Sequence, residues 1–146
     1  MSEVEIRKAV KIPILDMIEE TAKDTARLYP SLRTVGIMAA TGTVRSGLYQ
    51  KQFHNLNIKT VSPTDDDQAK LMQAIYSVKA GDLSKSIPTA IEIGQRLIKA
   101  GSEAIVAGCT EIPLILKPGD LPIPIIDATQ ILAKRAVELA RNENRK

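Results

Sequence analysis

The sequence contains a single cysteine, no tryptophan and few aromatic residues, which make up 3% of its 146 residues. One cysteine excludes a disulfide within the chain and a cysteine-rich zinc site. The scarcity of aromatic side chains argues against binding of single-stranded nucleic acid, because that binding relies on base stacking. The core is therefore expected to consist mainly of isoleucine, leucine, valine and alanine.

A strong net charge and long apolar runs are also missing. The formal net charge is +3 and the basic residues are spread along the chain, so no nucleic-acid surface is expected. Apolar stretches such as residues 123–126 are far shorter than the roughly 20 residues that span a bilayer. The N-terminus lacks the charged-then-apolar order of a signal peptide. We therefore expect a cytoplasmic protein with neither a membrane nor a nucleic-acid partner.

Short apolar stretches alternate with helix-like stretches along the chain. This alternation predicts an α/β fold, a single doubly wound domain in which helices flank a four-stranded parallel sheet. The strands are expected at residues 34–39, 58–61, 103–107 and 123–126. The helices are expected at residues 14–28, 44–56, 64–80, 83–100 and 129–142, with a short helix after Cys109. Pro88 lies about one turn inside the fourth of these helices, so that helix is expected either to start later or to be kinked there.

The loops that follow parallel strands gather at one edge of a sheet. Here they contain Thr41-Gly42-Thr43 after the first strand, residues 62–65 after the second, Cys109-Thr110-Glu111 after the third, and Asp127 after the fourth. Two of these loops lead into helix N-termini, whose free N–H groups bind carboxylates and phosphates. The first loop has too few glycines for a dinucleotide, and no Walker loop is present. A small carboxylate is therefore the expected ligand, with no metal.

Cys109 follows the third predicted strand directly. Nearby helix N–H groups would favour its thiolate, as in reactive cysteines. On residue type alone, a buried structural cysteine is the alternative.

Several motifs are similar, in order and spacing, to those of the aspartate/glutamate racemases, the aspartate racemase branch in particular. They are Gly108-Cys109-Thr110-Glu111-Ile112-Pro113-Leu114, Ile12-Pro13-Ile14-Leu15-Asp16-Met17-Ile18, Val35-Gly36-Ile37 with Thr41-Gly42-Thr43, Lys79-Ala80-Gly81, and Pro124-Ile125-Ile126-Asp127. The similarity covers residues 11–140.

This resemblance implies an isomerase that uses neither pyridoxal phosphate nor a metal. Members of the family have two similar α/β halves, and one cysteine from each half flanks Cα of the amino acid. The resemblance makes Cys109 one of these catalytic thiols. It also assigns substrate contacts to the following residues: Thr41, Gly42, Thr43, Lys79, Thr110 and Glu111.

The chain departs from the family pattern because the first half, with its own cysteine and a substrate-binding arginine, is missing. Residues 1–11 resemble the end of that half, or form an edge strand at Val4-Glu5-Ile6, so we divide the chain into this segment and a domain of residues 12–146. The closing helix is expected to expose an apolar face that needs a new partner.

Three outcomes stay open for the missing half. Two copies of the chain could form a homodimer, or one chain could pair with another half-domain. Either assembly would supply two thiols to one site. The chain could instead be a truncated, non-catalytic domain that binds carboxylates or serves assembly. The third possibility is a reaction with one cysteine, as in related decarboxylases and isomerases.

Several of the polar residues also have simple structural explanations. Lys79 and Glu111 suit helix ends for dipole reasons, and Thr43 and Asp127 suit helix N-caps. His54 is expected at the surface. The acidic run at residues 65–67 is expected to open a helix rather than to bind a metal.

Overall fold

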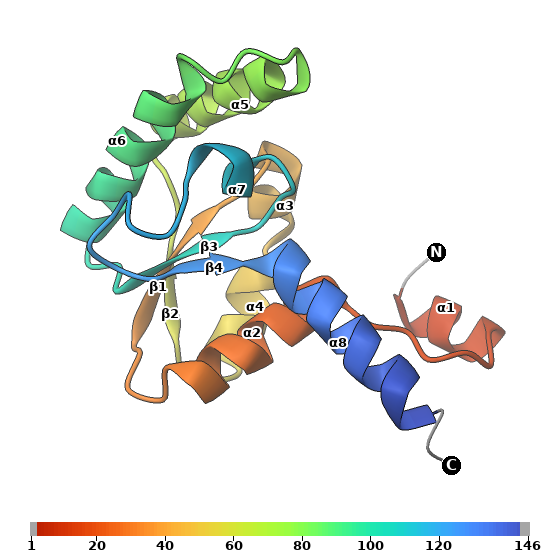
Figure 1. The fold of residues 1–146 in the computed structure, drawn as a ribbon. Coiled ribbons are helices and arrows are strands. Elements are labelled where there is room, and N and C mark those ends of the chain that lie inside the picture. The colour runs from red at the N-terminus through yellow and green to blue at the C-terminus, as the bar shows by residue number, and fades with distance from the viewer. Residues whose placement is uncertain (1–2, 144–146) are drawn as a thin grey trace.

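Four parallel strands form the centre of the fold, and helices cover both faces of the sheet (Figure 1). The structure, a computed structural model, describes residues 3–143. The strands are β1 (Thr34–Met38), β2 (Lys59–Val61), β3 (Ala104–Ala107) and β4 (Ile125–Asp127), in the spatial order β2-β1-β3-β4. This is the predicted α/β architecture, and β1 and β3 are its two central strands.

The two faces of the sheet have separate hydrophobic cores. One core includes side chains from α5 (Asp65–Lys79), α6 (Ser86–Lys99) and α7 (Ile112–Ile115). The other includes side chains from α2 (Met17–Leu28), α4 (Leu48–His54) and α8 (Ala128–Glu143). Along β3, Ile105 and Ala107 belong to the first core, whereas Ala104 and Val106 belong to the second. This alternation follows from the two-residue period of a strand.

Three helix boundaries differ from the sequence prediction. α2 begins at Met17 rather than at Ile14, because the Asp16 carboxylate caps it by accepting from the N–H groups of Ile18 and Glu19. The helix predicted at residues 44–56 is two helices, α3 (Thr41–Ser46) and α4, since Gly47 between them has φ +69°. α6 begins at Ser86, which leaves Pro88 within the first turn, where proline is tolerated.

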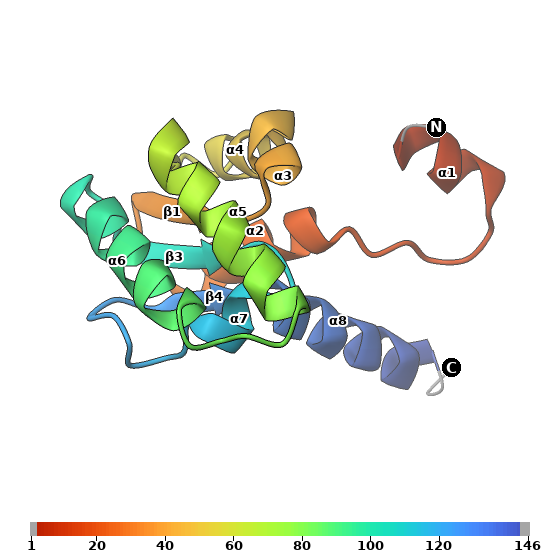
Figure 2. The same cartoon turned by 90° about the horizontal axis from the view of Figure 1, so that it is seen from above.

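Two segments project beyond the sheet edge at which the strands end. They are α1 (Glu3–Ala9) with the chain that follows it, and the distal part of α8 (Figures 1 and 2). α1 is a helix, so the edge strand considered for residues 4–6 is not formed. Both segments expose apolar side chains, with Ile12 72% and Val137 50% exposed.

Within residues 3–143, no helix is both long and apolar enough to cross a bilayer.

Candidate active site at the carboxyl edge of the sheet

The backbone brings Cys109 beside the loop that follows β1. Ala107 pairs with Met38 in the parallel register, and the Gly108 N–H donates to the Met38 carbonyl at 2.8 Å. A Cβ at Gly108 would lie 3.1 Å from the Ala39 Cβ and 2.9 Å from the Tyr49 Cε2. Only glycine allows this close approach. The first residue of the cysteine turn (residues 108–111) therefore packs against Ala39, which comes just before the threonine turn (residues 40–43).

The Cys109 side chain is half-buried against the core formed with α5, α6 and α7. Burial raises the pKa of its thiol above the usual value, although the N–H groups of Ile112 and Glu111 favour the thiolate. The negative charge of Glu111 raises the thiol pKa further. The expected N–H groups lie beside the sulfur and favour its thiolate, but they do not decide the direction in which the pKa moves. Desolvation and a nearby carboxylate outweigh the backbone donors.

Glu111 connects the cysteine turn to the end of α5. Its carboxylate lies 3.6 Å from the Lys79 ammonium, with 17% of the Glu111 side chain and 58% of the Lys79 side chain exposed. Burial opposes ionisation of Glu111, but its own N–H, the Thr110 hydroxyl, the Cys109 thiol and Lys79 together lower its pKa. Four predicted site residues therefore form one group: Lys79, Cys109, Thr110 and Glu111.

Thr41, Gly42 and Thr43 occupy the first three positions of α3. The N-cap is Ala40, which offers no side-chain cap, so the alternative of Thr43 as an N-cap is wrong. The N–H groups at the start of a helix have no acceptor within the helix. The Thr41 N–H donates to the Met72 sulfur at 3.3 Å, whereas Gly42 and Thr43 follow at the positions where a carboxylate can be bound.

Two buried polar residues, one beside each turn, are not predicted from the sequence. The Gln68 side chain donates to the Thr41 hydroxyl oxygen, and Tyr49 packs beneath Gly108. Burial raises the pKa of Tyr49 to about 12, with a further increase from the charges of Cys109 and Asp16, whereas Thr21 lowers it. A signal for Gln68 was available, because it lies on the same helical face as Leu71, Ile75 and Val78.

The other polar residues have structural roles. The Asp127 carboxylate accepts from the Gln130 N–H at 3.0 Å, which confirms its N-cap role. His54 is exposed in the last turn of α4, as expected. The acidic run begins α5, but Asp67 is buried and pairs with Arg96. In the part of the chain that the structure describes, no group of three His, Cys, Asp or Glu side chains could hold a metal ion.

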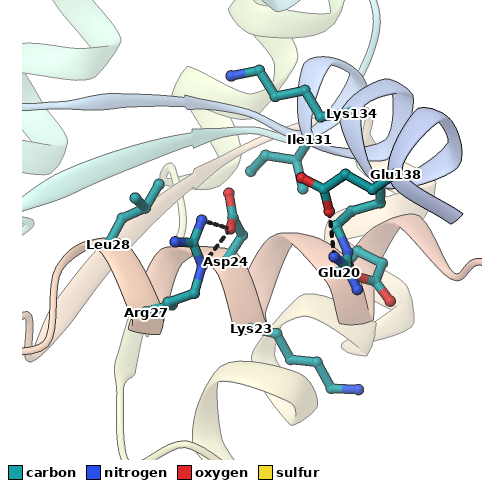
Figure 3. A pocket seen from close by; sticks show the side chains of 9 residues that line it. Glu20, Lys23, Asp24, Arg27, Leu28, Ile131, Lys134 and Glu138 are labelled. Atoms are coloured by element: carbon teal, nitrogen blue, oxygen red, sulfur yellow. Dashed lines mark hydrogen bonds and ion pairs between the residues drawn. The ribbon is translucent and has the colours of Figure 1, made fainter. Parts of the chain in front are cut away.

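A groove of about 540 Å³ between α2 and α8 contains none of the predicted site residues (Figure 3). Five of its charged side chains already pair with one another. Arg27 contacts Asp24 at 2.5 Å, and Arg135 contacts Glu20 at 2.8 Å and Glu138 at 2.5 Å. Because these charges are internally compensated, the groove is a weaker candidate for a carboxylate than the two turns.

Comparison with known families tests the resemblance seen in the sequence. The family described as Asp/Glu/Hydantoin racemase matches residues 4–136, which include every predicted site residue. The chain belongs to this racemase family. Racemases are isomerases, so the family agrees with the enzyme class that the motifs imply.

Curated relatives differ in how much of their length corresponds to this chain. An uncharacterized protein of Pectobacterium carotovorum subsp. carotovorum is 35% identical over 133 residues, which are 90% of this chain and 85% of that protein. A broad specificity amino-acid racemase of Bacillus subtilis (strain 168) is 28% identical over 133 residues, which cover 91% of this chain and 57% of the relative.

Solved racemase structures have the same fold over part of their length. The Picrophilus torridus aspartate racemase superposes with a TM-score of 0.76 at 30% identity, covering 89% of this chain and 54% of that one. An aspartate racemase homologue from Pyrococcus horikoshii OT3 superposes with a TM-score of 0.83 at 24% identity, covering 94% and 61%. The chain thus spans between half and two thirds of these proteins, consistent with one half of the racemase fold.

Proposed function

We propose that this chain supplies one half of an amino-acid racemase site that needs no cofactor. In this proposal the Cys109 thiol exchanges a proton with Cα of a small dicarboxylic amino acid, of which aspartate is the first candidate. The observation that carries the proposal is the half-buried Cys109 beside the threonine turn, with the N–H groups of Glu111 and Ile112 near its sulfur. Family membership supports the reaction class.

The reaction requires a base and an acid on opposite faces of Cα. One cysteine thiolate takes the α-proton, and the electron pair stays on Cα as a carbanion stabilised by the carboxylate. A second thiol then returns its own proton to the other face, which inverts the centre and leaves that sulfur as a thiolate. Because residues 1–146 contain one cysteine, the proposed mechanism takes its second thiol from outside this stretch of sequence.

The two turns offer different groups to the amino acid. Thr41, Gly42 and Thr43 are proposed to hold the α-carboxylate through hydroxyl and N–H donors. Lys79 is proposed to meet the second carboxylate, and it would have to leave or share its contact with Glu111 to do so. Thr110 and Glu111 are proposed to contact the ligand or the thiol from the cysteine turn.

The proposed partner is a second copy of this chain or another racemase half. α1 and the distal part of α8 extend past the edge that carries both turns (Figure 2). Exposed apolar side chains, Ile12 in the chain that follows α1 and Val137 in α8, suit contact with a partner that covers the same edge. A partner that covers Cys109 would also exclude water from the thiol.

Proton exchange at Cα tests the enzymatic proposal. The full chain is incubated with L-aspartate in heavy water, and deuterium at Cα and the appearance of D-aspartate are followed. We expect both, and we expect Cys109→Ser to reduce the exchange rate by about 100-fold or more, the usual contribution of a positioned acid or base. Solution mass measured in parallel tests the shared site, because a strict monomer that inverts aspartate would contradict it.

A second candidate function is binding of a carboxylate without catalysis. The raised pKa of Cys109 favours it, because a protonated thiol is a poor base. This function predicts that L-aspartate binds but that no deuterium is incorporated, with Cys109→Ser identical to the wild type. Deuterium incorporation without inversion would instead indicate one working thiol, as in a one-cysteine decarboxylase or isomerase.

A further inference from the structure

Gln68 is a polar side chain that is almost fully buried next to the threonine turn. Only 8% of the residue is exposed, although it lies in the first turn of α5. Its Nε2 donates to the Ala39 carbonyl at 3.0 Å and to the Thr41 Oγ1 at 3.3 Å. Both contacts connect α5 to the residues that join β1 to α3.

These two contacts determine what Thr41 can offer to a ligand. The Ala39 carbonyl can only accept, so the nitrogen of the Gln68 amide must face it. The second amide hydrogen then reaches the Thr41 oxygen, which leaves the hydroxyl hydrogen of Thr41 to be donated elsewhere. The Thr41 backbone N–H is already used by the Met72 sulfur. The hydroxyl is therefore the group with which Thr41 can bind an anion.

Gln68 makes these contacts while its own oxygen is left without a partner. Within the described residues, Gln68 Oε1 is buried and accepts no hydrogen bond. An unpaired buried acceptor lowers stability, and an apolar side chain of similar length would avoid that loss. Gln68 and Thr41 also line the same cavity of about 360 Å³, together with Arg45 and Asp65. The amide thus fits a role in orienting a binding group better than a role in packing alone.

We propose that Gln68 is a positioning residue that orients the Thr41 hydroxyl to donate to the carboxylate of the bound amino acid. This inference rests on the proposed function, since it assumes that the threonine turn binds a carboxylate. It adds a residue that touches no ligand and that acts through Thr41.

A double-mutant cycle distinguishes positioning from simple packing. L-aspartate affinity is measured by calorimetry for the full wild-type chain, Gln68→Met, Thr41→Val and the double variant. We expect Gln68→Met to weaken binding about 10-fold, typical of a lost hydrogen bond to a charged group. In the Thr41→Val background the same change should have less than about a twofold effect, because the hydroxyl it positions is gone. Equal losses in both backgrounds would overturn the inference.

Three control variants complete the test. Gln73→Met is the matched change at an exposed position of the same helix and should leave affinity unchanged. Thr41→Ser retains the hydroxyl and should retain sensitivity to Gln68→Met. If Gln68→Met does not fold, Gln68→Glu is used instead, because it keeps the side-chain size. Its carboxylate can only accept, so the hydroxyl hydrogen of Thr41 points toward residue 68 and away from a ligand. It should therefore weaken L-aspartate binding, and an unchanged affinity would contradict the inference.

The outcomes also separate this inference from the proposed function. Wild-type chain that neither binds L-aspartate nor exchanges its α-proton would overturn both. Binding that is weakened equally by Gln68→Met with and without the Thr41 hydroxyl would overturn only the positioning role.

Discussion

The threonine turn and the cysteine turn follow the two central strands of the sheet, yet they differ in chemistry. The threonine turn presents hydroxyl and N–H groups without a charged side chain at residues 40–43. The cysteine turn packs a thiol against a carboxylate, which in turn contacts a lysine. The first arrangement suits binding of an anion, whereas the second suits transfer of a proton.

This difference leads to an expectation about which function the chain can perform by itself. The hydrogen-bond donors of the threonine turn are its own N–H and hydroxyl groups, and Gln68 contacts one of them, the Thr41 hydroxyl. All of these groups belong to one chain. The basicity of the thiol depends on burial and nearby charge, and in this chain both act against ionisation. We therefore expect binding to be a property of the single chain and catalysis to require a partner that changes the surroundings of Cys109.

The largest expected difference between the turns concerns their glycines. Gly108→Ala places a Cβ 2.9 Å from the Tyr49 ring, whereas Gly42→Ala meets nothing within 4 Å. We expect Gly108→Ala to destabilise the protein by about 1–3 kcal/mol, the usual effect of overpacking. Gly42→Ala, within α3, should be neutral or stabilising by up to about 1 kcal/mol. Urea unfolding measures both, and equal effects would contradict the close packing at the cysteine turn.

A smaller effect is expected on the ionisation of Cys109. The rate of alkylation by iodoacetamide rises with the thiolate fraction, so its pH midpoint should lie above that of a free cysteine. Glu111→Gln removes a negative charge that raises the thiol pKa, so the midpoint should move to lower pH. Glu92→Gln, an exposed carboxylate on α6, is the control and should leave the midpoint unchanged. A midpoint that is the same in Glu111→Gln and the wild type would refute the coupling within the cysteine turn.

The smallest expected change in stability comes from breaking the ion pair between Lys79 and Glu111. Because the Lys79 side chain is 58% exposed, Lys79→Met should alter the free energy of unfolding by less than about 0.5 kcal/mol. Calorimetry should nevertheless detect weaker binding of L-aspartate, if Lys79 meets its second carboxylate. Unchanged affinity would leave Lys79 with a structural role at the end of α5.

Much of the fold could be predicted from local sequence patterns. The strand β3 is a short apolar run, as predicted, and Gly81 and Gly101 lie just past the ends of α5 and α6, as expected for helix ends. The break at Gly47 was missed because the surrounding residues continue a helical pattern. The start of α2 was also missed, because Asp16 was not recognised as its cap.

The candidate site was predictable only in part, for a physical reason. The positions of Cys109 and the threonines at strand ends follow from the order of elements along the chain. The burial of Gln68 and its contact with Thr41 depend on how α5 packs against the sheet. Whether the pKa of Cys109 is raised or lowered depends on burial, which opposes ionisation, and on the N–H donors, which favour it. Residue types alone do not show which of the two effects is larger.

The sequence alone determined that parallel strands would carry a lone thiol and two threonines to one edge, because strand and helix periodicities are local properties. Only the tertiary structure decided the strand order, which brings the starts of the two turns together, and the ionisation state of the Cys109 thiol. Proximity and desolvation arise from atoms far apart in the chain. They appear only once those atoms are packed together.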